Sequence, residues 1–103
     1  MRILMKVSIP VEDGNKAVRA GKLGETIKAI LDEQKPESVY FTAENGKRTG
    51  LLFLHMQDSA EIPKYAEPWF LAFNAEIEME PVMTPEDLAN GSPAFESAVK
   101  KYG

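Results

Sequence analysis

The sequence predicts a single α+β domain, in which helices cover one face of a four-stranded antiparallel sheet. In residues 2–9 and 74–82 apolar side chains occupy alternate positions, as is typical of strands with one buried face. The segment Gly50–Met56 is instead apolar at both alternations, which indicates a central strand covered on both sides. The chain's own helices can cover one side of this strand, so the other side requires a second subunit or a ligand.

Composition limits the class of protein. A length of 103 residues suits one domain, with a core of about residues 1–83 and a helical tail of about 84–103. The chain has no cysteine, which excludes disulfides, a thiol nucleophile and a cysteine-ligated metal. The net charge of -4 argues against a nucleic-acid partner. No apolar run is long enough for a signal peptide or membrane span, so we expect a cytoplasmic protein without a membrane partner.

The first half of the chain reads as a strand followed by an interrupted helix. Residues 2–9 form the strand, which ends at Pro10, and a helix is expected from about Asp13, with Asp13 as its N-cap. The segment Gly21–Gly24 predicts a bend, because two glycines are costly inside a helix. Beyond it the helix has one apolar face and ends before Pro36. That face consists of Leu23, Ile27, Ile30 and Leu31.

A hairpin and a second helix follow. Strands are expected at about 38–43 and 48–56, joined at Asn45-Gly46, a dipeptide that tolerates the positive φ of a tight turn. Asp58 and Ser59 are candidate caps for a helix, which Pro68 is expected to kink or split. After the last strand, Thr84-Pro85 starts a helical tail that Gly91 interrupts. One side of the tail carries Phe95, Ala98, Val99 and Tyr102.

The order β-α-β-β-α-β is that of the ferredoxin-like fold, with the first and third strands in the middle of the sheet. Nine apolar residues are expected to face the helices: Ile3, Met5, Val7, Val39, Phe41, Leu52, Leu54, Ile77 and Met79. The opposite face then carries Lys6, Tyr40, Thr42, Leu51, Phe53, His55 and Glu78.

The strand order, the proline in the second helix and the ending Phe73–Val82 resemble the dimeric α/β-barrel superfamily, and most of all its small uncharacterised bacterial members. The resemblance covers about residues 1–88. It implies a homodimer whose sheets pack face to face, and a pocket between each sheet and its helices or loops. Because members include cofactor-free monooxygenases, isomerases, haem enzymes and proteins without known activity, the resemblance does not select a reaction.

His55, the only histidine, is the candidate catalytic residue, because imidazole exchanges protons near neutral pH. The alternative is a strand-end histidine that forms a hydrogen bond across the dimer. The candidate ligand-binding residues are Lys6, Tyr40, Phe53, Trp69 and Glu78. For these residues too a structural role is open: Lys6 can pair with Glu78 or Glu76 across strands, and Trp69 can belong to the core.

Three functions fit these observations. The first is a small dimeric protein that binds a small molecule in a pocket beside its sheet. The second is a cofactor-independent enzyme of monooxygenase or isomerase type, with His55 as acid or base. The third is a structural or partner-binding dimer without catalysis. We expect no cofactor, and no metal site either, because glutamates alternating along a strand are usually solvated or paired.

Overall fold

The computed structural model describes residues 1–103 and contains one four-stranded antiparallel sheet. Its strands are β1 (Arg2–Ile9), β2 (Ser38–Glu44), β3 (Lys47–His55) and β4 (Glu76–Pro81), in the spatial order β2-β3-β1-β4. The first and third strands therefore lie in the middle. The expected ferredoxin-like α+β fold is confirmed.

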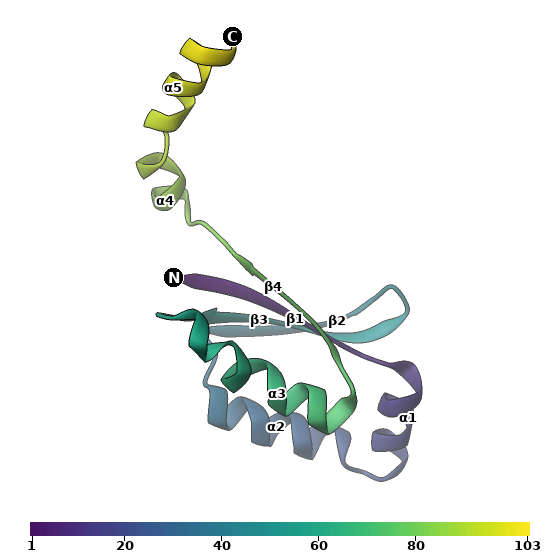
Figure 1. Ribbon diagram of the computed structural model, residues 1–103. Coiled ribbons are helices and arrows are strands. Elements are labelled where there is room, and N and C mark those ends of the chain that lie inside the picture. Colours follow the sequence, from purple (N-terminus) through teal and green to yellow (C-terminus); the bar gives the residue numbers. More distant parts are fainter.

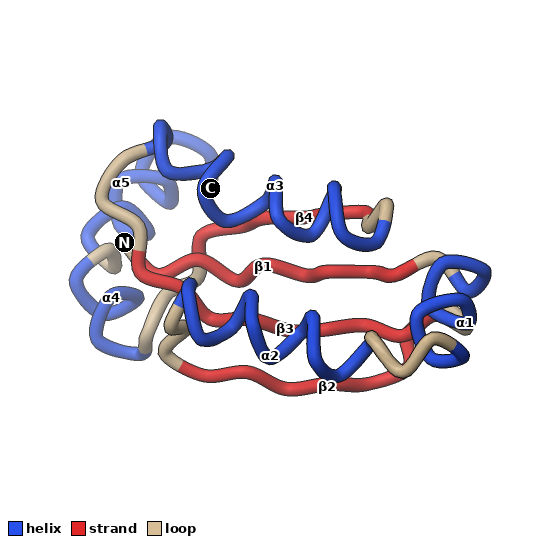
Figure 2. The backbone as a smooth tube through the Cα atoms, turned by 90° about the horizontal axis from the view of Figure 1, so that it is seen from below, coloured by secondary structure: helices blue, strands red, loops and turns tan.

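Three helices lie on one side of this sheet, two of them against its face and one beyond the ends of the strands (Figures 1 and 2). They are α1 (Val11–Arg19), α2 (Leu23–Gln34) and α3 (Ile62–Phe73), and a short 3-10 turn, η1 (Ser59–Glu61), precedes α3. The expected bend separates α1 from α2, where Gly21 has a φ of 67°. The start of α1 was expected at Asp13, which is wrong. Pro10 is the N-cap, because its carbonyl accepts the first helical hydrogen bond from Gly14 N, at 2.9 Å.

The helix α3 contains Pro68 and is nevertheless continuous from Ile62 to Phe73, so the proline does not split it. Proline at this position cannot donate to the carbonyl of Lys64, four residues earlier. The side-chain amide of Gln34 in α2 lies there instead: Gln34 Nε2 donates to Tyr65 O at 2.9 Å and reaches Lys64 O at 3.5 Å. A donor from a neighbouring helix thus replaces the one that proline lacks.

The register of the strands decides which side chains face the helices. Leu52 and Leu54 lie opposite Met5 and Ile3 on the helix side, and all four are at most 6% exposed. The expected facing of β3 is therefore confirmed, with Leu51, Phe53 and His55 on the other side. We call that other side the open face, since none of α1, α2 and α3 covers it (Figure 1).

The hairpin between β2 and β3 turns at Asn45 and Gly46, with φ values of 53° and 75°, as the Asn-Gly dipeptide predicts. The strand β2 lies at the edge of the sheet, and none of its residues is buried (Figure 2). Phe41 in this strand consequently stays 58% exposed, although its ring lies on the helix side, against the position of Gly50. Phe41 thus faces the helix side as expected, and it lies at the edge of the core.

Two more helices, α4 (Pro85–Asn90) and α5 (Pro93–Tyr102), form an arm that leaves the body after β4. Figure 1 shows the arm on the side of the sheet away from α2 and α3. The molecule extends 59 Å along its longest axis, with a radius of gyration of 17.3 Å. A compact domain of this length has a radius of about 13 Å. No residue of α4 or α5 is buried. None of the helices is long and apolar enough to cross a membrane.

Candidate functional site

A cavity of about 510 Å³ lies between the sheet and α2, toward the β2 edge. Pockets of roughly 300–1,000 Å³ are the size that small organic ligands occupy. Its walls are formed by Val7, Ile9, Leu23, Gly24, Ile27, Phe41, Thr42, Arg48, Thr49, Gly50 and Trp69. These residues come from three strands and from α2 and α3, so the tertiary fold alone assembles the cavity.

Gly50 explains why there is a cavity at this place. In the register of the sheet Gly50 lies between Val7 of β1 and Phe41 of β2, at a position whose side chain would face the helices. A Cβ atom at Gly50 would meet Leu52 Cδ1 at 3.3 Å and Phe41 Cε1 at 3.5 Å. Because glycine has no side chain, the row of apolar side chains has a gap here, beside the exposed Phe41 of edge strand β2.

Arg48 is the only ionisable residue in the wall of this cavity. Its backbone pairs with Ile9, so the side chain belongs to the helix side of the sheet. Arg48 Nη2 donates to Asn15 Oδ1 at 3.1 Å, and the guanidinium packs against Gly14. None of the five ion pairs in the structure involves Arg48. A half-buried guanidinium without a carboxylate partner can bind an anionic group.

Trp69 links the cavity to the core. It is 1% exposed and stacks with Phe73, the ring centroids lying 6.2 Å apart. Its indole Nε1 donates to Gln34 Oε1 at 3.1 Å. Trp69 is therefore a core residue, which is one of the two roles that the sequence left open. Its ring also contributes to the cavity wall.

The other candidate ligand-binding residues lie on the opposite side of the sheet from Trp69. The register places Lys6, Tyr40, Phe53 and Glu78 on the open face, and none of them lines the cavity. Tyr40 and Phe53 are neighbours there, in an edge-to-face arrangement with ring centroids 6.4 Å apart. The structure therefore brings four of the five residues to one surface, without enclosing them in a pocket.

The ion pair expected for Lys6 has a different partner. Lys6 and Glu78 are directly opposite in the β1–β4 register, yet Lys6 Nζ lies 3.4 Å from both carboxylate oxygens of Glu44. Glu76, the other expected partner, pairs with Lys47 at 3.3 Å. The long lysine stem can reach across β3 to β2, so the strand register alone does not determine the partner.

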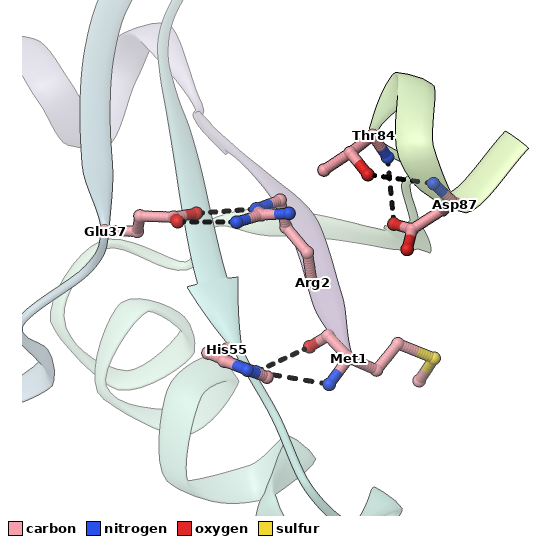
Figure 3. A network of polar contacts seen from close by, with 6 residues as sticks. All are labelled: Met1, Arg2, Glu37, His55, Thr84 and Asp87. Atoms are coloured by element: carbon pink, nitrogen blue, oxygen red, sulfur yellow. Dashed lines mark hydrogen bonds and ion pairs between the residues drawn. The ribbon is translucent and has the colours of Figure 1, made fainter. Parts of the chain in front are cut away.

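His55 lies exposed at the end of β3, on the open face and outside the cavity (Figure 3). Its Nδ1 lies 3.1 Å from the amine of Met1 and 3.3 Å from the Met1 carbonyl oxygen. No carboxylate forms a hydrogen bond with the imidazole. These contacts join the end of the strand to the chain's own N-terminus, and no carboxylate is aligned with His55 for proton transfer.

Beside His55, Arg2 forms a bidentate ion pair with Glu37, with both N–O distances at 2.7 Å (Figure 3). The hydrogen bond from Arg2 lowers the pKa of the Glu37 carboxyl below its ordinary value of 4.5. The pKa of Asp87 is also lowered, first by its hydrogen bonds with Thr84 and then by the charge of Arg2. The base of the arm therefore lies within electrostatic reach of β1.

A smaller hollow of about 220 Å³ lies at the other end of the sheet, between β4 and η1, and includes Met56 and Ile62. No group of three or more His, Asp or Glu side chains is arranged to hold a metal ion. The larger cavity, with its one free cation, is the better candidate site.

Sequence reasoning missed Arg48, Gly50 and Gln34. A signal for each was nevertheless present. Arg48 and Gly50 share the alternation of Leu52 and Leu54, so a charge and a gap on the buried side could be read from the facing of β3. Gln34 continues the apolar face of Ile27 and Ile30 at helical spacing, where a polar residue requires a buried partner.

Comparisons with known proteins add little. No protein-family model and no curated protein sequence matches the chain. Among solved structures, the chain is similar to part of a formyltetrahydrofolate deformylase from Pseudomonas putida KT2440, with 11% identity and a TM-score of 0.48 over 80% of this chain. The chain spans only 29% of that deformylase chain. A likeness of this size carries no conclusion about function.

Proposed function

We propose that this protein binds a small, largely apolar carboxylic acid in the cavity between the sheet and α2. The observation that carries the proposal is that Arg48 lines the cavity and makes no ion pair, in a wall with no other charged group. Apolar area supplies affinity in such pockets, and a few placed polar groups fix the orientation of the ligand. Arg48 would accept the carboxylate, while Val7, Ile27 and Phe41 contact the apolar part.

Binding is favoured over catalysis because of what lines the cavity. Arg48 stays protonated in proteins and is a poor acid or base, and no histidine, aspartate, glutamate or lysine lines the wall. His55, the candidate for an enzyme of monooxygenase or isomerase type, lies on the other side of the sheet. An enzyme that uses His55 would need a second site on the open face.

The open face is the proposed surface for a homodimer. Leu4, Leu51 and Phe53 form its half-buried apolar centre, and Tyr40 beside them is 60% exposed. A sheet face with apolar side chains at its centre gains stability when a second copy covers it. This dimer is compatible with a ligand in the cavity, because the two sites lie on opposite sides of the sheet.

The test of ligand binding is calorimetry with matched probes: decanoate, with a carboxylate, and decanol, with the same chain and no charge. Wild type is expected to bind decanoate more tightly than decanol. In Arg48→Met this preference should fall by about tenfold, because one charge-assisted contact is lost. Arg19→Met, which removes an exposed arginine of α1, is the matched control.

Gly50→Leu tests the place of binding, since a leucine side chain there would occupy the cavity. It should abolish binding of both probes, and circular dichroism reports whether the variant is folded. Two results would overturn the proposal. In the first, wild type and Arg48→Met bind decanoate with equal affinity. In the second, wild type binds neither probe and also fails to bind aromatic carboxylates such as naphthoate.

A further inference from the structure

The helix α5 presents an apolar face that nothing in the chain covers. Phe95, Val99 and Tyr102 follow one another at helical spacing and are 59%, 65% and 87% exposed. The helix has ten residues, and isolated helices shorter than roughly 12–15 residues are marginal in water. Because most helical stability in proteins comes from packing of the apolar face, α5 requires a surface to pack on.

The open face has the complementary properties. Its apolar centre of Leu4, Leu51 and Phe53 is bordered along β4 by Glu78 and Glu80. Neither glutamate takes part in any of the five ion pairs of the structure. The last turn of α5 carries Lys100 and Lys101, which are likewise without ion-pair partners. The two surfaces therefore match in apolar character, and the last turn of α5 supplies cations for Glu78 and Glu80, while its first turn carries Glu96.

The arm does not lie on the open face of its own chain. It continues from β4, whose pairing with β1 extends to a hydrogen bond from Val82 N to Arg2 O at 3.1 Å. The capping box of Thr84 and Asp87 then starts α4, at the same corner of the sheet. From there the arm projects away from the body, on the side of the open face (Figure 1).

We propose that the arm of one copy lies on the open sheet face of a second copy, and that the exchange is reciprocal. The inference rests on the proposed dimer and specifies how its surface is covered: by a helix rather than by the partner's sheet. Charge favours this arrangement. Two open faces packed on each other would bring together surfaces that both carry Glu78 and Glu80, whereas the side-chain cations of this face, Arg2, Lys6 and Lys47, are already in ion pairs. The arm supplies Lys100 and Lys101 instead.

The first experiment is a charge-reversal rescue in the full chain, with the dimer dissociation constant measured by analytical ultracentrifugation. The double variant Lys100→Glu/Lys101→Glu should weaken the dimer by about tenfold or more, as several like charges are brought together. Adding Glu78→Lys/Glu80→Lys to the same chain should restore most of the affinity. The matched control Lys16→Glu/Arg19→Glu makes the same change in net charge in the last turn of α1, on the other side of the sheet, and should leave the constant unchanged.

The second experiment locates the contact, using the absence of natural cysteines. Chains carrying Tyr40→Cys on the open face and chains carrying Val99→Cys on α5 are mixed, with a tag that distinguishes their masses, and oxidised. The expected product is a disulfide between the two kinds of chain. Ala29→Cys, on the exposed side of α2, replaces Val99→Cys in the control and should give no such product.

The outcomes separate the inference from the proposed dimer. In one outcome the charge reversals do not change the dimer dissociation constant, and Tyr40→Cys chains cross-link only with each other. Such a dimer packs sheet on sheet, which overturns the arm exchange and leaves the proposed dimer standing. A monomeric mass at micromolar concentration overturns both the exchange and the dimer. A single chain that carries both Tyr40→Cys and Val99→Cys gives the last outcome. If this chain forms the disulfide internally while monomeric, the arm folds back on its own sheet, which also overturns the exchange.

Discussion

Gln34 of α2 and Trp69 of α3 are joined by a buried hydrogen bond in which the indole N–H donates to the amide oxygen over 3.1 Å. The same amide donates through its nitrogen to Tyr65 O at 2.9 Å, beside the carbonyl that Pro68 leaves without its helical donor. Gln34 is 7% exposed, and no buried side-chain polar atom in the structure lacks a partner. One side chain thus holds two helices together and compensates for a proline.

We expect Gln34→Ala to lower the free energy of unfolding by about 1–3 kcal/mol, because the Trp69 indole and the Tyr65 carbonyl lose their buried partner. Urea unfolding followed by tryptophan fluorescence measures the loss. Glu33→Ala, at the exposed neighbouring position, is the control and should change stability by less than about 0.5 kcal/mol. Pro68→Ala restores a donor for Lys64 O, so the cost of Gln34→Ala should be smaller in that background. Equal costs in both backgrounds would show that Gln34 does not compensate for Pro68.

Gly14→Ala separates stability from binding. A Cβ atom at Gly14 would come within 2.5 Å of Arg48 Nη1, so the guanidinium must move away from its position beside Asn15. Since alanine is a better helix former than glycine, the free energy of unfolding should stay the same or rise, by up to about 1 kcal/mol. Binding of decanoate should weaken. A variant that loses stability and keeps its affinity would contradict the role given to Arg48.

Lys35→Gly is expected to stabilise the fold. Lys35 ends α2 with a φ of 48°, in the left-handed region that favours glycine, and its N–H donates to Leu31 O at 2.8 Å. Glycine keeps this hydrogen bond and relieves the backbone strain, at some cost from its greater freedom in the unfolded chain. The net gain should be below about 1 kcal/mol, seen as a small rise in Tm. Lys35→Val, which is β-branched, should lower the Tm.

The Glu37–Arg2 pair predicts a dependence of stability on pH. The pKa of Glu37 is lower in the folded protein than its ordinary value of 4.5, so the unfolded state takes up a proton at higher pH than the folded state does. The contribution of the pair is therefore complete above that ordinary value and is lost as the pH falls through the folded pKa. In Glu37→Gln, unfolding measured at several acidic pH values should show a shallower loss of stability than wild type. Identical slopes would mean that the ion pair does not persist in solution.

Local signals in the sequence were enough for the elements. Alternation predicted β1 and β4, Asn45-Gly46 predicted the hairpin turn, and Gly21 predicted the break between α1 and α2, because each depends on backbone preferences of nearby residues. The order of these elements then predicted the ferredoxin-like fold. Asp13 was taken as an N-cap because its side chain is a good acceptor, but the fixed φ of Pro10 starts the helix earlier.

The candidate site depended on contacts between distant residues. The sequence determined that β3 is apolar on both faces and that a tail with an apolar stripe follows the sheet. Only the tertiary structure decided that Gly50 leaves a cavity under edge strand β2, that Arg48 faces it without a carboxylate, and that His55 lies on the opposite side. The physical reason is that periodicity fixes which side of its own strand or helix a residue occupies. Which side chains then meet is decided by register and by how far each helix extends over the sheet.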